Sequence, residues 1–201
     1  MLNKTNINKI ASRIHGWIYD DERELLYTLA KDCKGSGVIV EIGSWKGKST
    51  IMLGQGSKDG SKITVYAIDP HIGSPEHRER YGEVWTFNEF KNNIKGAKLD
   101  DIVIPIVKTS EKANKNFELP VELIFIDGAH DYESVKLDFV LWFPKVIYGG
   151  IMAFHDVFEG TGPKKVVEEF LYESKFFRNV KLVHTIAFGE KCGKLHRVII
   201  L

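Results

Sequence analysis

The chain has 201 residues, 43% of them hydrophobic, which suits one domain with a sizeable core. Its 28 Lys and Arg residues nearly balance its 27 Asp and Glu residues, so charge gives no reason to expect nucleic acid or membrane binding. No apolar run is long enough to cross a bilayer, and the first residues lack the apolar core of a signal peptide. We therefore expect a cytoplasmic protein. Its 2 cysteines show no metal-ligand spacing and are expected to be reduced thiols.

The predicted elements alternate between helices and short apolar strands. Segment 7–34 is predicted to be helical, since its apolar side chains recur at roughly helical spacing. Five apolar runs follow as predicted strands: 38–42, 63–68, 102–107, 123–126 and 151–154. The helices between them are predicted at 49–55, 84–94, 111–116 and 132–143. Strands without strict alternation, separated by helices, are typical of a parallel sheet that is covered on both faces.

The C-terminal part is expected to add an edge hairpin to this sheet. A helix is predicted after Gly162, followed by strands at 180–186 and 196–201. The glycine-containing segment 189–194 is predicted as the turn between these strands, which would then pair antiparallel. Because the sequence contains no repeats or linkers, residues 1–201 are expected to form one α/β domain.

Four of the predicted strands deliver polar or glycine residues to one edge of the sheet. In open parallel sheets, ligands bind beyond the carboxyl ends of the strands. Those ends carry Gly43, Asp69, Asp127 and the pair His155-Asp156. Any one of them alone would be ordinary turn chemistry, but their joint placement predicts a binding site.

The turn after the first strand nearly matches two phosphate-binding patterns. Residues 43–49 read GSWKGKS, with three residues between the glycines where a phosphate loop needs four. One missing residue is a serious defect in a loop whose backbone amides wrap around phosphate. The dinucleotide fingerprint fits less well, because Trp45 occupies the position of its second glycine.

A third interpretation uses two acids, Glu41 within the first strand and Asp69 at the end of the second. An acid buried in a strand is unfavourable unless a cation meets it. Asp69 is placed to accept hydrogen bonds from both hydroxyls of a ribose, and charge-assisted bonds contribute about 1.5–3 kcal/mol each. An adenosine that carries a cationic amino-acid tail would satisfy both acids.

Several blocks of sequence point together to one family. They are GWI at 16–18, LYTLA at 26–30, VEIGSWKGKST at 40–50, FIDGAHDY at 125–132, Trp142, Gly149-Gly150 and His155-Asp156. In these blocks the chain resembles class I S-adenosylmethionine (SAM)-dependent methyltransferases, of the small-molecule O-methyltransferase type related to catechol and macrolide-sugar methyltransferases. The resemblance implies a three-layer Rossmann-like fold, with a mostly parallel sheet and an antiparallel C-terminal edge hairpin. Residues 1–34 would form an N-terminal helical segment and residues 35–201 the core.

The resemblance also implies which residues bind SAM. Glu41 would meet the methionine ammonium group, Ser49 the methionine carboxylate and Asp69 the ribose. The other implied cofactor-binding residues are Gly43, Ser44 and Gly47 in the turn, Ser110 and Glu111 beside the adenine, and Asp127.

A hydroxyl acceptor has to lose its proton, which calls for a general base or a metal ion that lowers its pKa. Asp127 and His130 are the predicted catalytic residues, with His130 as the base. Relatives bind a divalent cation, Mg²⁺ or Mn²⁺, at positions that correspond to Asp127, His155 and Asp156. His155 replaces an oxygen ligand, which would suit manganese better than magnesium. The sequence leaves open both the identity of the general base and the presence of a metal ion.

The expected function is transfer of a methyl group from SAM to a small-molecule acceptor, at a hydroxyl of a sugar, phenol or natural product. Two alternatives stay open. One is a nucleotide-binding phosphotransferase built on Gly47-Lys48-Ser49, and the other is a SAM-binding module without catalysis. A homodimer is also left open.

Overall fold

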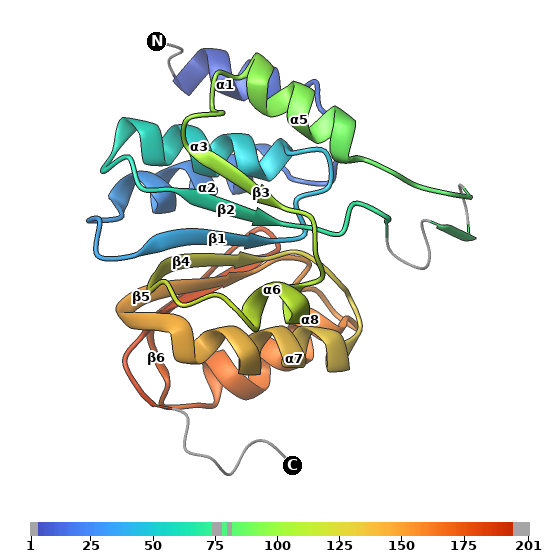
Figure 1. The fold of residues 1–201 in the computed structure, drawn as a ribbon. Coiled ribbons are helices and arrows are strands. Elements are labelled where there is room, and N and C mark those ends of the chain that lie inside the picture. The colour runs from blue at the N-terminus through green and yellow to red at the C-terminus, as the bar shows by residue number, and fades with distance from the viewer. Residues whose placement is uncertain (1–3, 74–77, 80–81, 195–201) are drawn as a thin grey trace.

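The computed structural model describes residues 4–73, 78–79 and 82–194, which form three layers, with one sheet between two groups of helices (Figure 1). One face is covered by α1 (Lys4–Ala11), α2 (Asp20–Asp32), α3 (Lys48–Asp59) and α5 (Phe87–Gly96). The other face is covered by α6 (Ser110–Asn114), α7 (Tyr132–Trp142) and α8 (Gly162–Val167). No helix among the described residues is both long and apolar enough to cross a membrane.

The sheet has seven strands in the order β3-β2-β1-β4-β5-β7-β6. Their bounds are β1 Val38–Ile42, β2 Val65–Ile68, β3 Val103–Ile106, β4 Val121–Ile126, β5 Val146–Phe154, β6 Phe177–Val183 and β7 Ile186–Lys191. β1 to β5 are parallel, whereas β7 runs antiparallel to both β5 and β6. The predicted fold class, a mostly parallel sheet with an antiparallel C-terminal edge hairpin, is confirmed.

Alternate residues of the central strands supply two cores. Ile39 and Leu123 belong to the core with α2 and α3, while Val40 and Ile124 belong to the core with α7 and α8. All four side chains are fully buried. Because both faces of the sheet are covered, a polar ligand can reach the strands only at their ends.

The predicted N-terminal helix over 7–34 is wrong in one respect, because α1 and α2 are separate helices. Glu22 marks the start of α2, where its carboxylate accepts the Tyr19 N–H at 2.9 Å and satisfies a free amide of the first turn. The Arg23 guanidinium donates to the Ile18 carbonyl oxygen at 3.0 Å and fixes the connection between the helices. Ile18 is buried without being helical, so the apolar pattern continues across the break.

The C-terminal hairpin lies earlier in the chain than predicted. β6 and β7 are joined at residues 184–185, so the predicted turn at 189–194 is wrong. Gly189 lies inside β7, where a Cβ atom would meet Phe177 at 3.2 Å. This glycine therefore marks close packing within the sheet rather than a turn. The predicted strand 196–201 lies outside the described residues.

Candidate active site

The turn after β1 has a backbone conformation that few residues adopt. Gly43, Trp45 and Gly47 all have positive φ angles, of 85°, 47° and 89°. A Cβ atom at Gly43 would lie 2.0 Å from the Asp127 carbonyl oxygen, so glycine is required for β1 and β4 to end this close together. α3 starts directly after Gly47, and the free amides of its first turn lie at this edge of the sheet.

Glu41 lies fully buried beneath this turn. Its Oε2 accepts a hydrogen bond from Thr50 Oγ1 at 2.5 Å, while Oε1 has no partner of regular geometry among the described residues. Burial raises the pKa of Glu41 to about 7, although nearby hydroxyls, Ser49 first, act to lower it. The main groups that shift this pKa are three hydroxyls and the Asp127 carboxyl, so among the described residues Glu41 has hydroxyl donors but no cationic partner.

Asp69 connects the turn to the end of β2. Its Oδ2 accepts the Trp45 N–H at 2.7 Å, and its Oδ1 accepts the His71 N–H at 2.6 Å. His71 is fully buried and has a φ angle of 58°. Each carboxylate oxygen keeps a second lone pair, so Asp69 is held in a fixed orientation and can still accept hydrogen bonds from a ligand.

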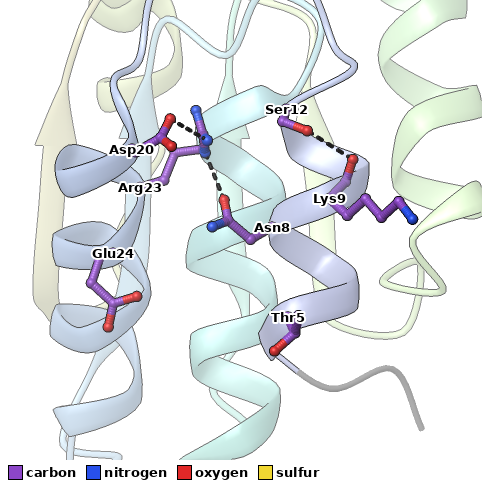
Figure 2. Close-up of a pocket in the computed structure, with 7 residues that line it drawn as sticks. All are labelled: Thr5, Asn8, Lys9, Ser12, Asp20, Arg23 and Glu24. Carbon is purple, nitrogen blue, oxygen red and sulfur yellow. Dashed lines mark hydrogen bonds and ion pairs between the residues drawn. The ribbon is translucent and has the colours of Figure 1, made fainter.

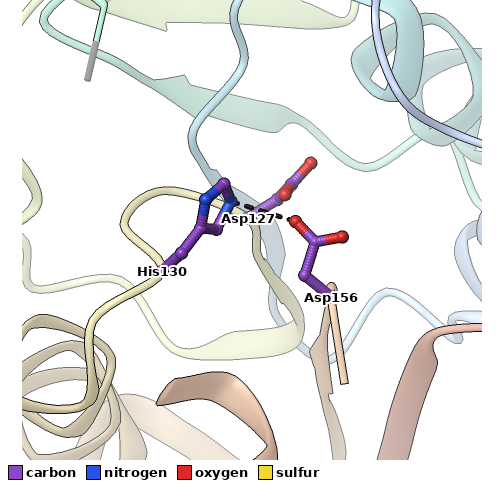
Figure 3. Close-up of side chains that lie close together, drawn as sticks. All are labelled: Asp127, His130 and Asp156. Atoms are coloured by element: carbon purple, nitrogen blue, oxygen red, sulfur yellow. Dashed lines mark ion pairs between the residues drawn. The ribbon is translucent and has the colours of Figure 1, made fainter. Parts of the chain in front are cut away.

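Asp127 after β4 and Asp156 after β5 lie with His130 at the same edge (Figure 3). His130 Nε2 is 3.0 Å from Asp156 Oδ2. Each of the three side chains offers one possible ligand atom, and these atoms lie within 4.8 Å of one another. Asp156 has a φ angle of 57°, a conformation that is unfavourable for a residue with a side chain and is concentrated at functional sites. The structure thus brings both predicted catalytic residues together with Asp156.

His155 lies behind this cluster and is only 3% exposed. Its Nδ1 is 2.9 Å from Asp127 Oδ1 and 3.5 Å from Asp156 Oδ2. Its Nε2 is 3.3 Å from Glu22 Oε2 on α2. Both ring nitrogens therefore face carboxylates, and the imidazole that shares the cluster with the two aspartates is His130. A role for His155 as a metal ligand stays a prediction.

The charges of the cluster depend on one another. Burial opposes a charge on His155, but the carboxylates around it, Asp127 foremost, raise its pKa to about 12, so the ring is an imidazolium. Burial likewise opposes a charge on Asp156, yet hydrogen bonds from both histidines hold the pKa of Asp156 well below its usual range. The hydrogen bond to Asp156 raises the pKa of His130. Burial raises the pKa of Asp127, although the charge of His155 opposes this shift.

Ser110 and Glu111, predicted beside the adenine, begin α6 after β3. Ser110 Oγ accepts a hydrogen bond from Trp142 Nε1 at 2.8 Å. The buried carboxyl group of Asp138 is a second neighbour of Ser110, and burial raises its pKa to about 6 while the Ser110 hydroxyl lowers it. Glu111 is exposed and pairs with Lys115 at 3.1 Å.

Lys48 is not oriented as the lysine of a phosphate loop would be. Its Nζ donates to the Gly16 carbonyl oxygen at 2.7 Å, in the connection between α1 and α2. The lysine side chain therefore attaches the N-terminal segment to α3. This geometry disfavours the phosphotransferase alternative, in which Lys48 would bind the phosphates.

Sequence reasoning missed Glu22 as a site residue. Its contact with His155 joins positions 133 residues apart, and no local spacing pattern could reveal it. The cluster of three acids that begins at Asp20 is by itself typical of a helix start and gives no sign of a binding site.

Two surface hollows lie beside α1, and the second of them reaches Lys46 in the turn after β1. One of about 550 Å³ lies between α1 and α2, where Arg23 reaches between Asn8 and Asp20 (Figure 2). Another of about 500 Å³ lies between α1 and α5. Neither hollow is lined by a predicted site residue, and the Arg23 guanidinium is already used by Asn8, Asp20 and a backbone carbonyl. We therefore place the candidate active site at the edge of the sheet.

A profile of the methyltransferase domain family matches residues 40–157, more than half of the chain. The chain belongs to this family. The matched region includes the turn after β1, Asp69 and the Asp127–His130–Asp156 cluster. It leaves out α1, α2 and the β6–β7 hairpin.

Two curated relatives are uncharacterized proteins. The chain is 32% identical over 120 residues to one from Sinorhizobium fredii, covering 59% of this chain and 13% of the relative. It is 29% identical over 120 residues to one from Acanthamoeba polyphaga mimivirus, covering 58% of this chain and 50% of the relative. The match thus spans half or less of the length of either relative.

Solved methyltransferase structures share the fold. The O-methyltransferase NovP superposes with a TM-score of 0.71 at 20% identity, over 85% of this chain and 79% of NovP. The O-methyltransferase TomG from Streptomyces achromogenes, in complex with SAM, gives 0.66 at 13% identity, over 96% of this chain and 92% of TomG. A Podospora anserina methyltransferase bound to S-adenosylhomocysteine (SAH) gives 0.67 at 16% identity, over 93% and 86% of the two chains. At these low sequence identities, the similarity shows a shared fold and nothing more.

Proposed function

We propose that this protein transfers a methyl group from SAM to a hydroxyl group of a small molecule. One observation carries the proposal: in a chain of the methyltransferase domain family, Glu41, Asp69 and the Asp127–His130–Asp156 cluster all lie at the carboxyl edge of one sheet. Methyl transfer is an in-line displacement at a sulfonium carbon, so the protein mainly has to hold cofactor and acceptor in line. SAM as cofactor is supported by the two neighbours that were solved with SAM and SAH.

The cofactor would lie across the turn after β1. Its ammonium group would supply the counter-charge that Glu41 lacks, and Ser49 at the start of α3 would bind the carboxylate. The ribose hydroxyls would donate to Asp69, whose carboxylate the backbone already orients. Ser110 and Glu111 would border the adenine.

The turn itself would take a smaller part in recognition. Gly43, Ser44 and Gly47 would shape the floor beneath the cofactor. Ser44 is buried, and its hydroxyl has no partner of regular geometry among the described residues, although it is one of the hydroxyls that lower the pKa of Glu41.

His130 is the general base that we propose. Its side chain is 54% exposed, so an acceptor can reach it. Asp156 orients the ring through Nε2, which leaves Nδ1 to take the acceptor proton, and the aspartate then stabilises the imidazolium. Only the neutral ring accepts a proton, so turnover is expected to rise as the pH passes the raised pKa of His130.

A divalent cation is the other route to an activated hydroxyl that the family resemblance implies. The cluster would hold it through Asp127, His130 and Asp156, and this mixed set of ligands fits Mn²⁺ better than Mg²⁺. A bound cation would lower the pKa of the acceptor hydroxyl. The His155 imidazolium already balances charge beside the two aspartates, so the base route accounts for the site with the chain's own residues.

Calorimetric titration of the chain with SAM, SAH and ATP tests the cofactor. We expect heat of binding for SAM and SAH and none for ATP. Binding of ATP without binding of SAM or SAH would contradict the proposal.

Turnover of SAM on a panel of sugar, phenol and natural-product hydroxyl acceptors then separates an enzyme from a binding module. The panel is run with EDTA and again with Mn²⁺ or Mg²⁺. Turnover in EDTA supports the base route, whereas turnover only with added metal assigns the cluster to the cation. Binding of SAM with no turnover on any acceptor indicates the module.

A further inference from the structure

Two segments outside the family-matched region 40–157 meet at His155. Glu22 lies in the first turn of α2, and Thr185 lies in the turn between β6 and β7. Glu22 Oε1 accepts the Thr185 N–H at 3.0 Å and the Thr185 hydroxyl at 2.6 Å. Its Oε2 accepts the Tyr19 N–H at 2.9 Å and faces His155 Nε2 at 3.3 Å. One carboxylate thus joins the N-terminal helix, the C-terminal hairpin and the end of β5.

Glu22 is fully buried, yet its carboxylate is ionised. Burial alone would raise its pKa, but hydrogen bonds from His155 and Thr185 lower the pKa of Glu22 to about 2. A buried ion is strongly unfavourable without a partner, and the His155 imidazolium is that partner. The other ring nitrogen of His155 reaches Asp127 at 2.9 Å. The ring is therefore held at both ends by carboxylates.

We infer that Glu22 is a positioning residue that fixes the His155 ring, so that His155 in turn holds the Asp127 carboxylate in place within the cluster. Among the described residues, Glu22 is the hydrogen-bond partner of Nε2. Without its charge the ring can rotate away from Asp127. Misplacement of a reacting group by about 1 Å can lower a rate by about 10²-fold. The effect on turnover rests on the proposed function, whereas the effect on the His155 ring does not.

The deciding experiment is NMR of the His155 ring N–H protons in the full chain, with and without Glu22→Gln. Glutamine keeps one oxygen for the Tyr19 or Thr185 donors, but it lacks the charge. In the unsubstituted chain we expect both N–H protons to exchange slowly with water, because each bonds to a buried carboxylate. In Glu22→Gln we expect the Nε2 proton to lose this protection and the Nδ1 proton to lose part of it.

Glu122→Gln is the matched control. It also neutralises a buried carboxylate that accepts several backbone N–H groups, but it lies at the opposite edge of the sheet. Both His155 protons are expected to stay protected in this variant. If Glu22→Gln does not fold, Thr185→Val removes one hydroxyl donor from Glu22 and is expected to speed exchange at Nε2 to a smaller degree.

Turnover supplies the second readout, with the acceptor that the unsubstituted chain methylates best in the panel above. We expect Glu22→Gln to lower kcat about 10–100-fold, as loss of residues that orient a site's ligands does. The Kd for SAH is expected to stay within about twofold. A double variant with His155→Gln should be no slower than His155→Gln alone, because Glu22 acts through His155.

The inference is overturned if both His155 protons stay protected in Glu22→Gln, or if Glu122→Gln exposes them equally. Additive losses of kcat in the double variant would also contradict it. Failure to bind SAH would count against the proposed function instead, and it would leave the NMR result decisive for Glu22.

Discussion

Buried carboxylates at the amino ends and at the carboxyl ends of the parallel strands have opposite surroundings. These two sides of the sheet are its amino edge and its carboxyl edge. At the amino edge, Glu122 of β4 accepts backbone N–H groups from residues 34–37 at 2.5, 3.0, 2.8 and 3.2 Å. At the carboxyl edge of the neighbouring strand, Glu41 of β1 has one hydroxyl donor of regular geometry and a raised pKa. The hydrogen-bonding capacity of Glu122 is used within the fold, whereas that of Glu41 is partly unmet. The number of hydrogen-bond donors around a buried acid therefore distinguishes an acid that stabilises the fold from one that can still bind a ligand.

The largest expected effect is at the carboxyl edge, on turnover. Asp127→Asn and His130→Ala each remove a member of the cluster, and we expect kcat to fall about 10²–10⁴-fold, the usual range for a lost acid or base. SAM affinity is expected to stay within a few-fold, because the turn and Asp69 are untouched and Asp127→Asn keeps a side-chain oxygen at the implied cofactor contact. Steady-state kinetics and calorimetry check both quantities, with the exposed Glu133→Gln as control. If both variants stay fully active, the assignment of the base is wrong.

At the amino edge we expect an effect on stability alone. Glu122→Gln leaves the N–H groups of residues 34–37 with fewer oxygen acceptors, and the amide group adds a donor among donors. We expect the free energy of unfolding to fall by about 2–3 kcal/mol. The accompanying fall in Tm is about 4–12 °C for a chain of this size. Denaturant and thermal unfolding measure these changes.

The exposed Glu118→Gln is the control for that variant and should stay within about 0.5 kcal/mol of the unsubstituted chain. At a temperature where Glu122→Gln is folded, its kcat should be unchanged. If Glu122→Gln lost turnover without losing stability, Glu122 would not have a purely structural role. The proposed difference between the two edges would then be wrong.

The third prediction is that neutralising Glu41 raises the free energy of unfolding, whereas neutralising Glu122 lowers it. Its pKa rises from the ordinary 4.5 to about 7 in the folded chain, so folding favours the protonated form. The folded chain therefore loses stability relative to the unfolded chain as the pH rises from about 4.5 through about 7. Glu41→Gln cannot ionise, and at pH 8 we expect it to be more stable than the unsubstituted chain by about 1–3 kcal/mol.

The same Glu41→Gln variant should bind SAH more weakly, because the ammonium group loses its charged partner. Unfolding in urea at pH 5 and pH 8, with calorimetry of SAH, measures both effects. Equal stability gains at the two pH values, or unchanged SAH affinity, would show that Glu41 has no special role.

Local pattern was enough to predict the sheet and the residues at its carboxyl edge. Glu41, Asp69 and Asp127 stand at strand ends, and parallel strands place such ends together without any knowledge of distant contacts. The contact of Glu22 with His155 could not be predicted, since it depends on how α2 docks against a residue 133 positions away in the sequence. The turn predicted at Gly189 is wrong for a different reason. A glycine needed for close packing looks the same in sequence as one needed for a turn.

The most direct test of the account is a crystal structure of the chain soaked with SAH. We expect electron density across the turn after β1, with the ribose hydroxyls on Asp69 and the ammonium group toward Glu41. The sulfur should lie on the side of the Asp127–His130–Asp156 cluster. Density for SAH in the hollow between α1 and α2, with the carboxyl edge of the sheet empty, would contradict the account.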